Sequence, residues 1–291
     1  MMGNSLGSGR GSKQSTMPSY PIKPVDSLLL TSQCRHYQDR DEVPWDIQKY
    51  FAQRYSIFSR YDEGVYLTDD AWFGVTPEPV ASQVAMDVAH ADQKKTVLID
   101  VFAGAGGNTI AFALSRRWQR VIAVERDASA LACAQHNAEL YGVDPGLITW
   151  VLGDSFEYLE RLVQGSDELH PDLRVDISNA VLFASPPWGG PGYSSDEVFD
   201  LHTMQPYNLA KLHAAYCAMD HVLFLPRTSD IRQLARLAPR GGKIEVVQYC
   251  MQGASKGMVV YLPAGSADER SASTLDAPTA SVGSPLATGQ D

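Results

Sequence analysis

The sequence has few cysteines and no long apolar run, and each shortage excludes a class of protein. Its four cysteines, Cys34, Cys133, Cys217 and Cys250, lie far apart and include no C-x-x-C pair, which argues against a zinc knuckle or a disulfide framework. No run approaches the roughly 20 apolar residues that cross a bilayer, and the polar, Gly/Ser-rich start lacks the apolar core of a secretory signal. We therefore expect a soluble, intracellular chain without a membrane partner.

Positive charge is also scarce. The 291 residues include 24 Lys and Arg against 34 Asp and Glu, which gives a formal net charge of −10 at pH 7. This balance argues against a protein that coats long nucleic acid through many phosphate contacts. A small basic surplus lies between Arg10 and Arg60, where solvated surface and phosphate contact both remain open. Any contact with RNA is therefore expected to be local.

The regular patterning lies between two segments that have none. Residues 1–20 and 264–291 are rich in small and polar residues, and we predict that both are disordered tails. Residues 21–90 are predicted to form a helical extension. In it, aromatic residues recur every three to five positions from Pro44 to Tyr61, which predicts one helix with a buried aromatic stripe. A second helix is predicted to open with Thr76 as N-cap and to end near His90.

Residues 91–263 are predicted to form one α/β domain, because short β-rich runs there alternate with amphipathic stretches. Near-continuous apolar strands between helices predict a mostly parallel sheet with helices on both faces, and the last two strands are predicted to pair as an antiparallel hairpin. This order of elements is that of class I (Rossmann-like) methyltransferases. The predicted strands are 96–101, 120–125, 148–153, 179–184, 221–226, 243–252 and 257–262, and the predicted helices are 108–117, 127–142, 155–163, 208–219 and 230–237.

A Gly-rich turn leaves the first strand and enters a helix, which lets a cofactor approach the backbone closely. Such a turn can also cradle a dinucleotide pyrophosphate, but the third glycine of G-x-G-x-x-G would fall at Thr109. An acid, Asp100, opens the turn, and an acid repels pyrophosphate but attracts the sulfonium and ammonium groups of S-adenosylmethionine. The predicted donor-binding residues of this turn are Asp100, Phe102, Gly104, Gly106 and Asn108.

Two further acids end the next two predicted strands. Glu125 follows Asp100 by 25 residues and can accept both ribose hydroxyls, a feature that serves NAD and S-adenosylmethionine alike. Asp154 can meet the adenine amine, and it can equally cap the helix that begins at Ser155. Because the carboxyl ends of consecutive parallel strands share one edge of the sheet, these acids predict one site for the methyl donor.

The motif Ser185-Pro186-Pro187-Trp188 follows the fourth strand and is more specific than the Gly-rich turn. A polar residue, two prolines and an aromatic form the signature of methyltransferases that act on amino groups conjugated to a planar ring. Such a nitrogen is a poor nucleophile and must be held in line with the methyl group. The Ser185 hydroxyl and the Pro186 carbonyl can accept the amine's hydrogens, the prolines stiffen the turn, and Trp188 can stack on the base. The alternative is a rigid turn whose tryptophan packs into a core.

With these motifs established, the sequence resembles the trimethylguanosine synthase family, RNA cap guanosine-N2 methyltransferases that convert a 7-methylguanosine cap to its 2,2,7-trimethyl form. The resemblance runs from about Lys49 to Leu262, through KYFAQRYSIFSRYDEGV, WFGVTPE, DVFAGAGGNTIAFAL, SPPWGGPGY and FLPR. It implies that S-adenosylmethionine is the cofactor. It also implies capped small nuclear or nucleolar RNA as substrate, recruitment by ribonucleoprotein proteins, and a nuclear or nucleolar location with a cytoplasmic pool also compatible. No metal is expected, because the seven histidines are scattered and the sequence shows no metal-ligand cluster.

The resemblance also implies roles for individual residues. Trp188 would stack on the positively charged 7-methylguanine, with a cation–π contribution of about 1–2 kcal/mol. Lys49 and Arg227 would hold the cap phosphates. Thr76 and Phe58 match positions in a front segment that covers donor and cap, so the extension would be a lid. Helix capping and core packing remain open for these two residues.

Three other functions stay open at this point. The first is another amine methyltransferase that acts on adenine or internal guanine in RNA or DNA, because the Ser-Pro-Pro-Trp motif does not name the base. The second is a cap-binding adaptor without activity, against which the intact Asp100 and Glu125 argue. The third is a nicotinamide oxidoreductase, which a cofactor titration would separate. Gly74 stands where the family often has serine, which leaves one hydroxyl contact in question.

Overall fold

The computed structural model describes residues 22–90, 94–190, 196–239 and 241–265. Residues 1–20 and 266–291 of the two predicted tails lie outside the described residues. Seven strands form one sheet in the order β3-β2-β1-β4-β5-β7-β6, in which β1 to β5 are parallel and β7 runs antiparallel to both β5 and β6. The predicted α/β fold and its terminal hairpin are therefore confirmed. The strands are β1 Val97–Asp100, β2 Arg120–Glu125, β3 Ile148–Leu152, β4 Ala180–Ala184, β5 Asp220–Leu225, β6 Glu245–Met251 and β7 Ala254–Leu262.

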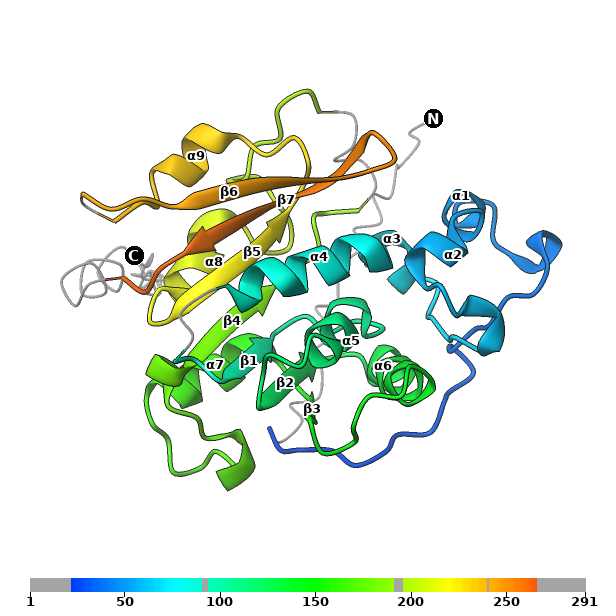
Figure 1. Ribbon diagram of the computed structural model, residues 1–291, viewed down its shortest axis with the longest axis horizontal. Coiled ribbons are helices and arrows are strands. Elements are labelled where there is room, and N and C mark those ends of the chain that lie inside the picture. Colours follow the sequence, from blue (N-terminus) through cyan, green and yellow to red (C-terminus); the bar gives the residue numbers. More distant parts are fainter. Residues whose placement is uncertain (1–21, 91–93, 191–195, 240, 266–291) are drawn as a thin grey trace, which may run out of the picture.

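Helices cover both faces of the sheet (Figure 1). Leu98 of β1 belongs to the core beneath α4, α5 and α6, whereas its neighbour Ile99 belongs to the core beneath α7 and α8. Successive strand residues point to opposite faces, so the apolar runs of the sequence supply both cores at once. The helices are α4 Glu78–Ala89, α5 Gly107–Leu114, α6 Ala128–Leu140, α7 Ser155–Val163, α8 Leu209–Tyr216 and α9 Ile231–Ala235.

The extension is made of short helical turns, and the single helix predicted from Pro44 to Tyr61 is wrong. Two helices, α1 Gln48–Phe51 and α2 Arg54–Ile57, occupy that stretch, and α3 Ala71–Gly74 follows them. Side chains satisfy carbonyls at the break, since Arg54 donates to Phe51 O (3.2 Å) and Gln53 donates to Lys49 O (3.1 Å). The backbone can therefore leave the helix without losing its hydrogen bonds.

The expected aromatic stripe is buried only in part. Phe51, Phe58 and Tyr61 are buried, but Tyr55 is exposed and Trp45 is 86% exposed. The spacing of the aromatic residues indicated that this stretch packs against the rest of the molecule. It did not determine which rings face inward, because the chain leaves the helical path between α1 and α2.

Thr76 is not the N-cap of α4. The cap position belongs to Pro77, and the Thr76 hydroxyl instead accepts a hydrogen bond from Asn108 Nδ2 at 3.0 Å. Thr76 is buried at 4% exposure, so this tertiary partner replaces the local one. The helix does end where expected, with His90 as C-cap.

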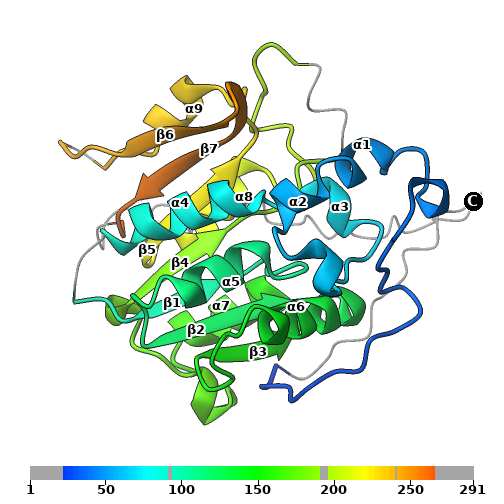
Figure 2. The same cartoon turned by 45° about the vertical axis from the view of Figure 1, so that its right-hand side comes forward.

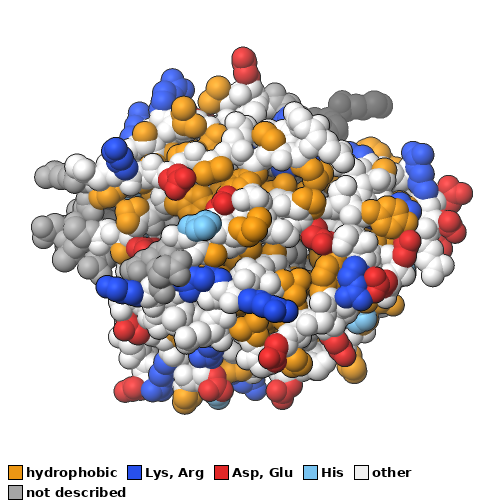
Figure 3. Space-filling model, in the orientation of Figure 1, with side chains coloured by type: hydrophobic (Ala, Val, Ile, Leu, Met, Phe, Trp, Pro, Cys, Tyr) orange, Lys and Arg blue, Asp and Glu red, His pale blue; other side chains and the backbone are white. Residues whose placement is uncertain are grey.

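The extension lies at the carboxyl edge of the parallel strands. Figures 1 and 2 show α1, α2 and α3 beyond the ends toward which the parallel strands point, and α4 packs against α5 on one face. On the face shown in Figure 3, positive and negative side chains are interspersed over the described residues. Within those residues, no helix is long and apolar enough to cross a membrane.

Candidate active site

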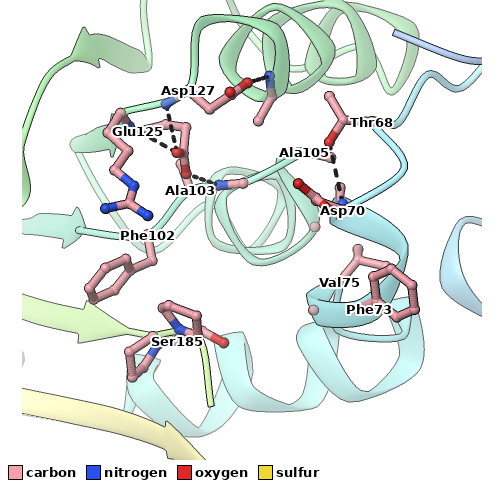
Figure 4. A pocket seen from close by; sticks show the side chains of 18 of the residues that line it. Thr68, Asp70, Phe73, Val75, Phe102, Ala103, Ala105, Glu125, Asp127 and Ser185 are labelled. Carbon is pink, nitrogen blue, oxygen red and sulfur yellow. Dashed lines mark hydrogen bonds between the residues drawn. The ribbon is translucent and has the colours of Figure 1, made fainter. Parts of the chain in front are cut away.

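A cavity of about 990 Å³ lies at the carboxyl edge of the sheet. Its walls are the turns that follow β1, β2, β3 and β4, closed by residues 68–76 of the extension. Figure 4 shows Glu125 on one side and Ser185 on another, with Phe102 between them, while Asp70 and Val75 face them from the extension. The predicted site residues that line the cavity are Thr76, Phe102, Gly104, Asn108, Glu125, Asp154, Ser185, Pro186 and Trp188.

The Gly-rich turn gives the cavity its floor. Gly106 adopts φ +94°, and a Cβ there would lie 3.1 Å from Ala134 Cα, so the turn can press against α6 only with glycine at this position. Gly104 also has a positive φ, of +53°, but a Cβ there would meet nothing within 4 Å. Gly104 therefore lines open space, whereas Gly106 supports the turn from behind and does not line the cavity.

Asp100 also lies behind the cavity wall. The side chain is fully buried, accepts a hydrogen bond from Thr109 Oγ1 at 2.6 Å, and accepts a second from Phe102 N at 3.3 Å. Burial raises the pKa of Asp100 to about 6, although the bonds from Thr109 and Phe102 oppose the shift. Asp100 therefore acts on a bound ligand through the shape and charge of the turn, because its side chain does not form part of the lining.

Glu125 uses most of its carboxylate to fix two turns. Its Oε2 accepts from Gly104 N at 2.9 Å, and its Oε1 accepts from Arg126 N at 2.8 Å and Asp127 N at 2.9 Å. Burial raises its pKa, and these three backbone donors oppose the shift. Since each carboxylate oxygen offers two acceptor positions, Oε2 retains one for a ligand hydroxyl.

Asp154 caps a helix, one of the two roles that the sequence allowed, and it also lies in the cavity wall. Its Oδ1 caps α7 by accepting from Phe156 N at 2.9 Å and Glu157 N at 3.1 Å, and the residue also lines the cavity. Oδ2 is not used by the cap. A carboxylate at this point therefore keeps one oxygen for a ligand.

Asn108 carries an unfilled acceptor into the cavity wall. While its Nδ2 donates to Thr76, its buried Oδ1 has no hydrogen-bond partner among the described residues. A buried polar atom without a partner is costly, so a donor group on a ligand would stabilise it. Phe58 lies elsewhere: it is 2% exposed, packs edge-on against Tyr141 with ring centroids 6.0 Å apart, and does not line the cavity.

The Ser185 to Trp188 turn forms the wall that follows β4. Trp188 Nε1 donates to Phe224 O at 3.2 Å, and the two rings are parallel within 2° with centroids 6.0 Å apart. Trp188 is half-buried and contributes to the cavity lining. The ring is thus held by packing and still borders the cavity, so the packing alternative and the stacking role are compatible.

Lys49 and Arg227 lie on the surface outside the cavity lining. Each of them has a backbone carbonyl bound by a glutamine side chain. Gln53 donates to Lys49 O and accepts from Lys256 Nζ at 3.4 Å, while Gln248 donates to Arg227 O at 3.2 Å. Lys256 belongs to β7 and Gln248 to β6, which are paired strands. Lys49 therefore lies on a segment that contacts β7, and the backbone of Arg227 contacts β6.

Several lining residues were missed by the sequence analysis. Asp69 and Asp70 come from the loop before α3, Arg126 follows Glu125, and Tyr207 precedes α8. The pair Asp69-Asp70 between Thr68 and the WFGVTPE motif was a signal that could have been used. Nothing local to Tyr207 marks it, because only the fold brings it to the strand ends.

The lining fits a cationic ligand with several hydrogen-bond donors. Five acids, Asp69, Asp70, Glu125, Asp127 and Asp154, line the cavity against two arginines, Arg35 and Arg126. This excess of negative charge attracts a sulfonium and an ammonium group and repels a pyrophosphate. Asn108, whose buried Oδ1 has no hydrogen-bond partner among the described residues, belongs to the same lining. Within the described residues, no group of three or more metal-ligating side chains is clustered.

Comparison with known proteins agrees with this chemistry. Residues 95–265 match the RNA cap guanine-N2 methyltransferase family. The chain is 35% identical to a trimethylguanosine synthase of Schizosaccharomyces pombe over 75% of its own length and 87% of that protein. It is also 35% identical to a trimethylguanosine synthase of Saccharomyces cerevisiae, over 65% of this chain and 57% of that protein.

A solved structure supports the fold alone. A protein of Porphyromonas gingivalis W83 described as a methyltransferase superposes with a TM-score of 0.51 at 17% identity, over 78% of this chain and 55% of that one. The family match and the sequence relatives carry the functional assignment, and the matched residues 95–265 include the Gly-rich turn and the Ser185 to Trp188 turn. The chain belongs to the RNA cap guanine-N2 methyltransferase family, whose reaction is the S-adenosylmethionine-dependent methylation of a guanine amino group.

Proposed function

We propose that this enzyme methylates the 7-methylguanosine caps of small nuclear and nucleolar RNAs, transfers two methyl groups in succession, and acts in the nucleus with proteins of the ribonucleoprotein particle. The observation that carries the site assignment is one continuous cavity. The acids of the β2 and β3 ends line one part of it and the Ser185 to Trp188 turn another. The methyl donor and the accepting amine can therefore meet without leaving the protein.

The chain's own residues divide the work of binding the donor. Asn108 Oδ1 and the acids of the lining would receive its ammonium, the remaining acceptor position of Glu125 Oε2 a ribose hydroxyl, and Asp154 Oδ2 the adenine amine. When bound, S-adenosylmethionine supplies an electrophilic methyl group. Gly104 leaves room for this ligand because the position that a Cβ would take there faces open space.

The accepting nitrogen is positioned by the turn after β4. Ser185 and Pro186 line the cavity, and their hydroxyl and carbonyl oxygens are acceptors that can orient the two amine hydrogens. Orientation matters here because the lone pair is delocalised into the purine and attacks only when the nitrogen is held in line. One acceptor still remains for the single hydrogen left after a first methylation, which is why we propose two transfers.

Trp188 selects the methylated base. Its indole is fixed by the bond to Phe224 O and by the parallel Phe224 ring, so one stacking plane is already built. A positively charged 7-methylguanine that stacks on this plane gains a cation–π term of about 1–2 kcal/mol, which an unmethylated guanine lacks. Lys49 and Arg227, which are both exposed outside the cavity lining, would contact the cap phosphates.

The test is a methyl-transfer assay with labelled S-adenosylmethionine and the dinucleotide m7GpppG. Chromatography of the digested cap separates the 2,7-dimethyl from the 2,2,7-trimethyl product. We expect both products in sequence and little label on GpppG. Transfer to internal adenine or guanine of an uncapped RNA, with none to the cap, would overturn the proposal.

Two tryptophan variants provide a matched comparison. Trp188→Ala should reduce turnover on m7GpppG by about tenfold or more, since loss of the stacking plane removes both affinity and orientation. Trp45→Ala removes a tryptophan that is 86% exposed and outside the cavity lining, and it should leave turnover within about twofold. Equal turnover of the two variants would show that Trp188 does not stack on the cap.

A further inference from the structure

Tyr207 is a cavity residue that the motifs do not explain. It lies between β4 and α8, is half-buried, and lines the cavity. Its ring centroid lies 5.8 Å from that of Phe102 and 4.7 Å from that of Phe156. Arg126 Nη1 donates a hydrogen bond to its hydroxyl oxygen at 3.3 Å. The ring is therefore held by the turns after β1 and β2 and by α7, and Lys211 Nζ of α8 lies 4.8 Å from its centroid.

The partners of Tyr207 assign it to the donor half of the cavity. Phe102 follows β1, Arg126 follows β2 and Phe156 follows β3, the strands whose ends carry Asp100, Glu125 and Asp154. The base-stacking half is built instead from β4 and β5, through Trp188 and Phe224.

The Tyr207 hydroxyl and the Asp154 carboxylate offer a hydrogen-bond donor and an acceptor in the donor half of the cavity. Because Arg126 donates to the Tyr207 oxygen, the phenol hydrogen stays available to donate elsewhere. Burial raises the pKa of Tyr207, with Asp154 and Glu125 adding to the shift and Arg126 opposing it, so the hydroxyl keeps its hydrogen at neutral pH. Asp154 Oδ2, which the helix cap does not use, offers an acceptor. An adenine edge presents the converse arrangement, an amine donor beside a ring-nitrogen acceptor.

We propose that Tyr207 binds the adenine of the methyl donor, with its ring as an apolar wall and its hydroxyl as a donor to a ring nitrogen. Asp154 accepts from the adjacent amine and completes the recognition. Tyr207 thereby determines specificity for adenine over purines that carry a hydrogen on that ring nitrogen. This assignment rests on the proposed function, because it takes S-adenosylmethionine as the ligand of the donor half.

The experiment measures binding by calorimetry, independently of turnover. The ligand is S-adenosylhomocysteine, which carries the same adenosine, titrated into the full chain and its variants. Tyr207→Phe keeps the wall and removes one hydrogen bond, so we expect about three- to tenfold weaker binding. Tyr207→Ala removes both and should weaken binding by about thirtyfold or more. Tyr55→Ala, a tyrosine outside the cavity lining, should bind within about twofold of the unmodified chain.

A second ligand tests the hydrogen bond alone. The hypoxanthine analogue of S-adenosylhomocysteine replaces the amine with a carbonyl and the neighbouring ring nitrogen with N–H, so it opposes both Asp154 and Tyr207. The unmodified chain should bind it at least about tenfold more weakly than the adenine ligand, and Tyr207→Phe should reduce that ratio.

The outcomes separate the two proposals. If the unmodified chain does not bind S-adenosylhomocysteine, the proposed function itself fails. If it binds and Tyr207→Phe leaves both the affinity and the adenine-to-hypoxanthine ratio unchanged, the role of Tyr207 is overturned while the proposed function stands. The phenylalanine variant decides this even if Tyr207→Ala does not fold, and titration with 7-methylguanosine triphosphate should show cap affinity unaltered in it.

Discussion

Replacement of Asp100 by asparagine should make the protein more stable at neutral pH while it weakens donor binding. The carboxyl is fully buried, and burial raises its pKa to about 6 from the ordinary value of 3.8. A raised pKa means that the folded state holds the proton more tightly than the unfolded chain does. The stability from this group is therefore fully present below pH 3.8 and is lost as the pH rises through about 6.

The size of the effect follows from the same two values. A difference between 3.8 and about 6 corresponds to about 3 kcal/mol of stability lost when Asp100 ionises. Asparagine cannot ionise, so the variant keeps that free energy at pH 8, less about 1 kcal/mol because the Thr109 hydroxyl loses its carboxylate acceptor. Removal of a negative charge beside the Gly-rich turn should still weaken S-adenosylmethionine binding at least about tenfold.

Urea unfolding of both proteins between pH 4.5 and 8.5 tests this reasoning. The unmodified chain should lose stability as the pH rises through this window, and Asp100→Asn should lose less. Some slope should persist in the variant, because burial also raises the pKa of Glu125. If Asp100→Asn is the less stable protein at pH 8, or if its stability depends on pH as steeply as that of the unmodified chain, burial does not raise the pKa of Asp100.

Four further substitutions test other parts of the chain. Phe58→Ala should lower the free energy of unfolding in urea by about 3 kcal/mol or more, because its ring packs on Tyr141. The folded variant should bind the methyl donor with unchanged affinity, and weaker binding would place Phe58 in the donor site. Asn108→Ala should weaken binding of the methyl donor, measured by calorimetry, about tenfold with little loss of stability. Unchanged affinity would show that Asn108 Oδ1 does not accept a hydrogen bond from the donor. Lys49→Ala and Arg227→Ala should each raise KM for m7GpppG, more at low salt, whereas a salt-independent effect would exclude phosphate contact.

The sheet and the acids at its edge were predictable because their signals are local. A strand buried on both faces reads as a continuous apolar run, so its last residue can be identified from the sequence. Glu125 and Asp154 follow such runs, and parallel strands place their carboxyl ends on one edge, so their convergence needed no further information. Ser185 and Trp188 reached the same cavity by the same rule.

The extension was less predictable because tertiary partners override its local preferences. Thr76 has a good N-cap side chain before a helix, yet Asn108 captures its hydroxyl from 32 residues away. Likewise, the aromatic spacing from Pro44 to Tyr61 suits one helix, but Arg54 and Gln53 supply donors that let it end early. Tyr207 shows the limit most plainly, since only assembly of the sheet brings it between Phe102 and Phe156.

Glu125 shows how the fold limits a role that the sequence leaves open. From the sequence alone, its carboxylate was free to accept both ribose hydroxyls. In the fold, the glutamate side chain meets three backbone N–H groups, from Gly104, Arg126 and Asp127, which fix the turns after β1 and β2. Four acceptor positions minus three leaves one. Glu125 therefore fixes the Gly-rich turn through bonds that the structure shows and keeps one acceptor for the proposed ribose contact, so shortening it to aspartate should disturb the Gly-rich turn as well as that contact.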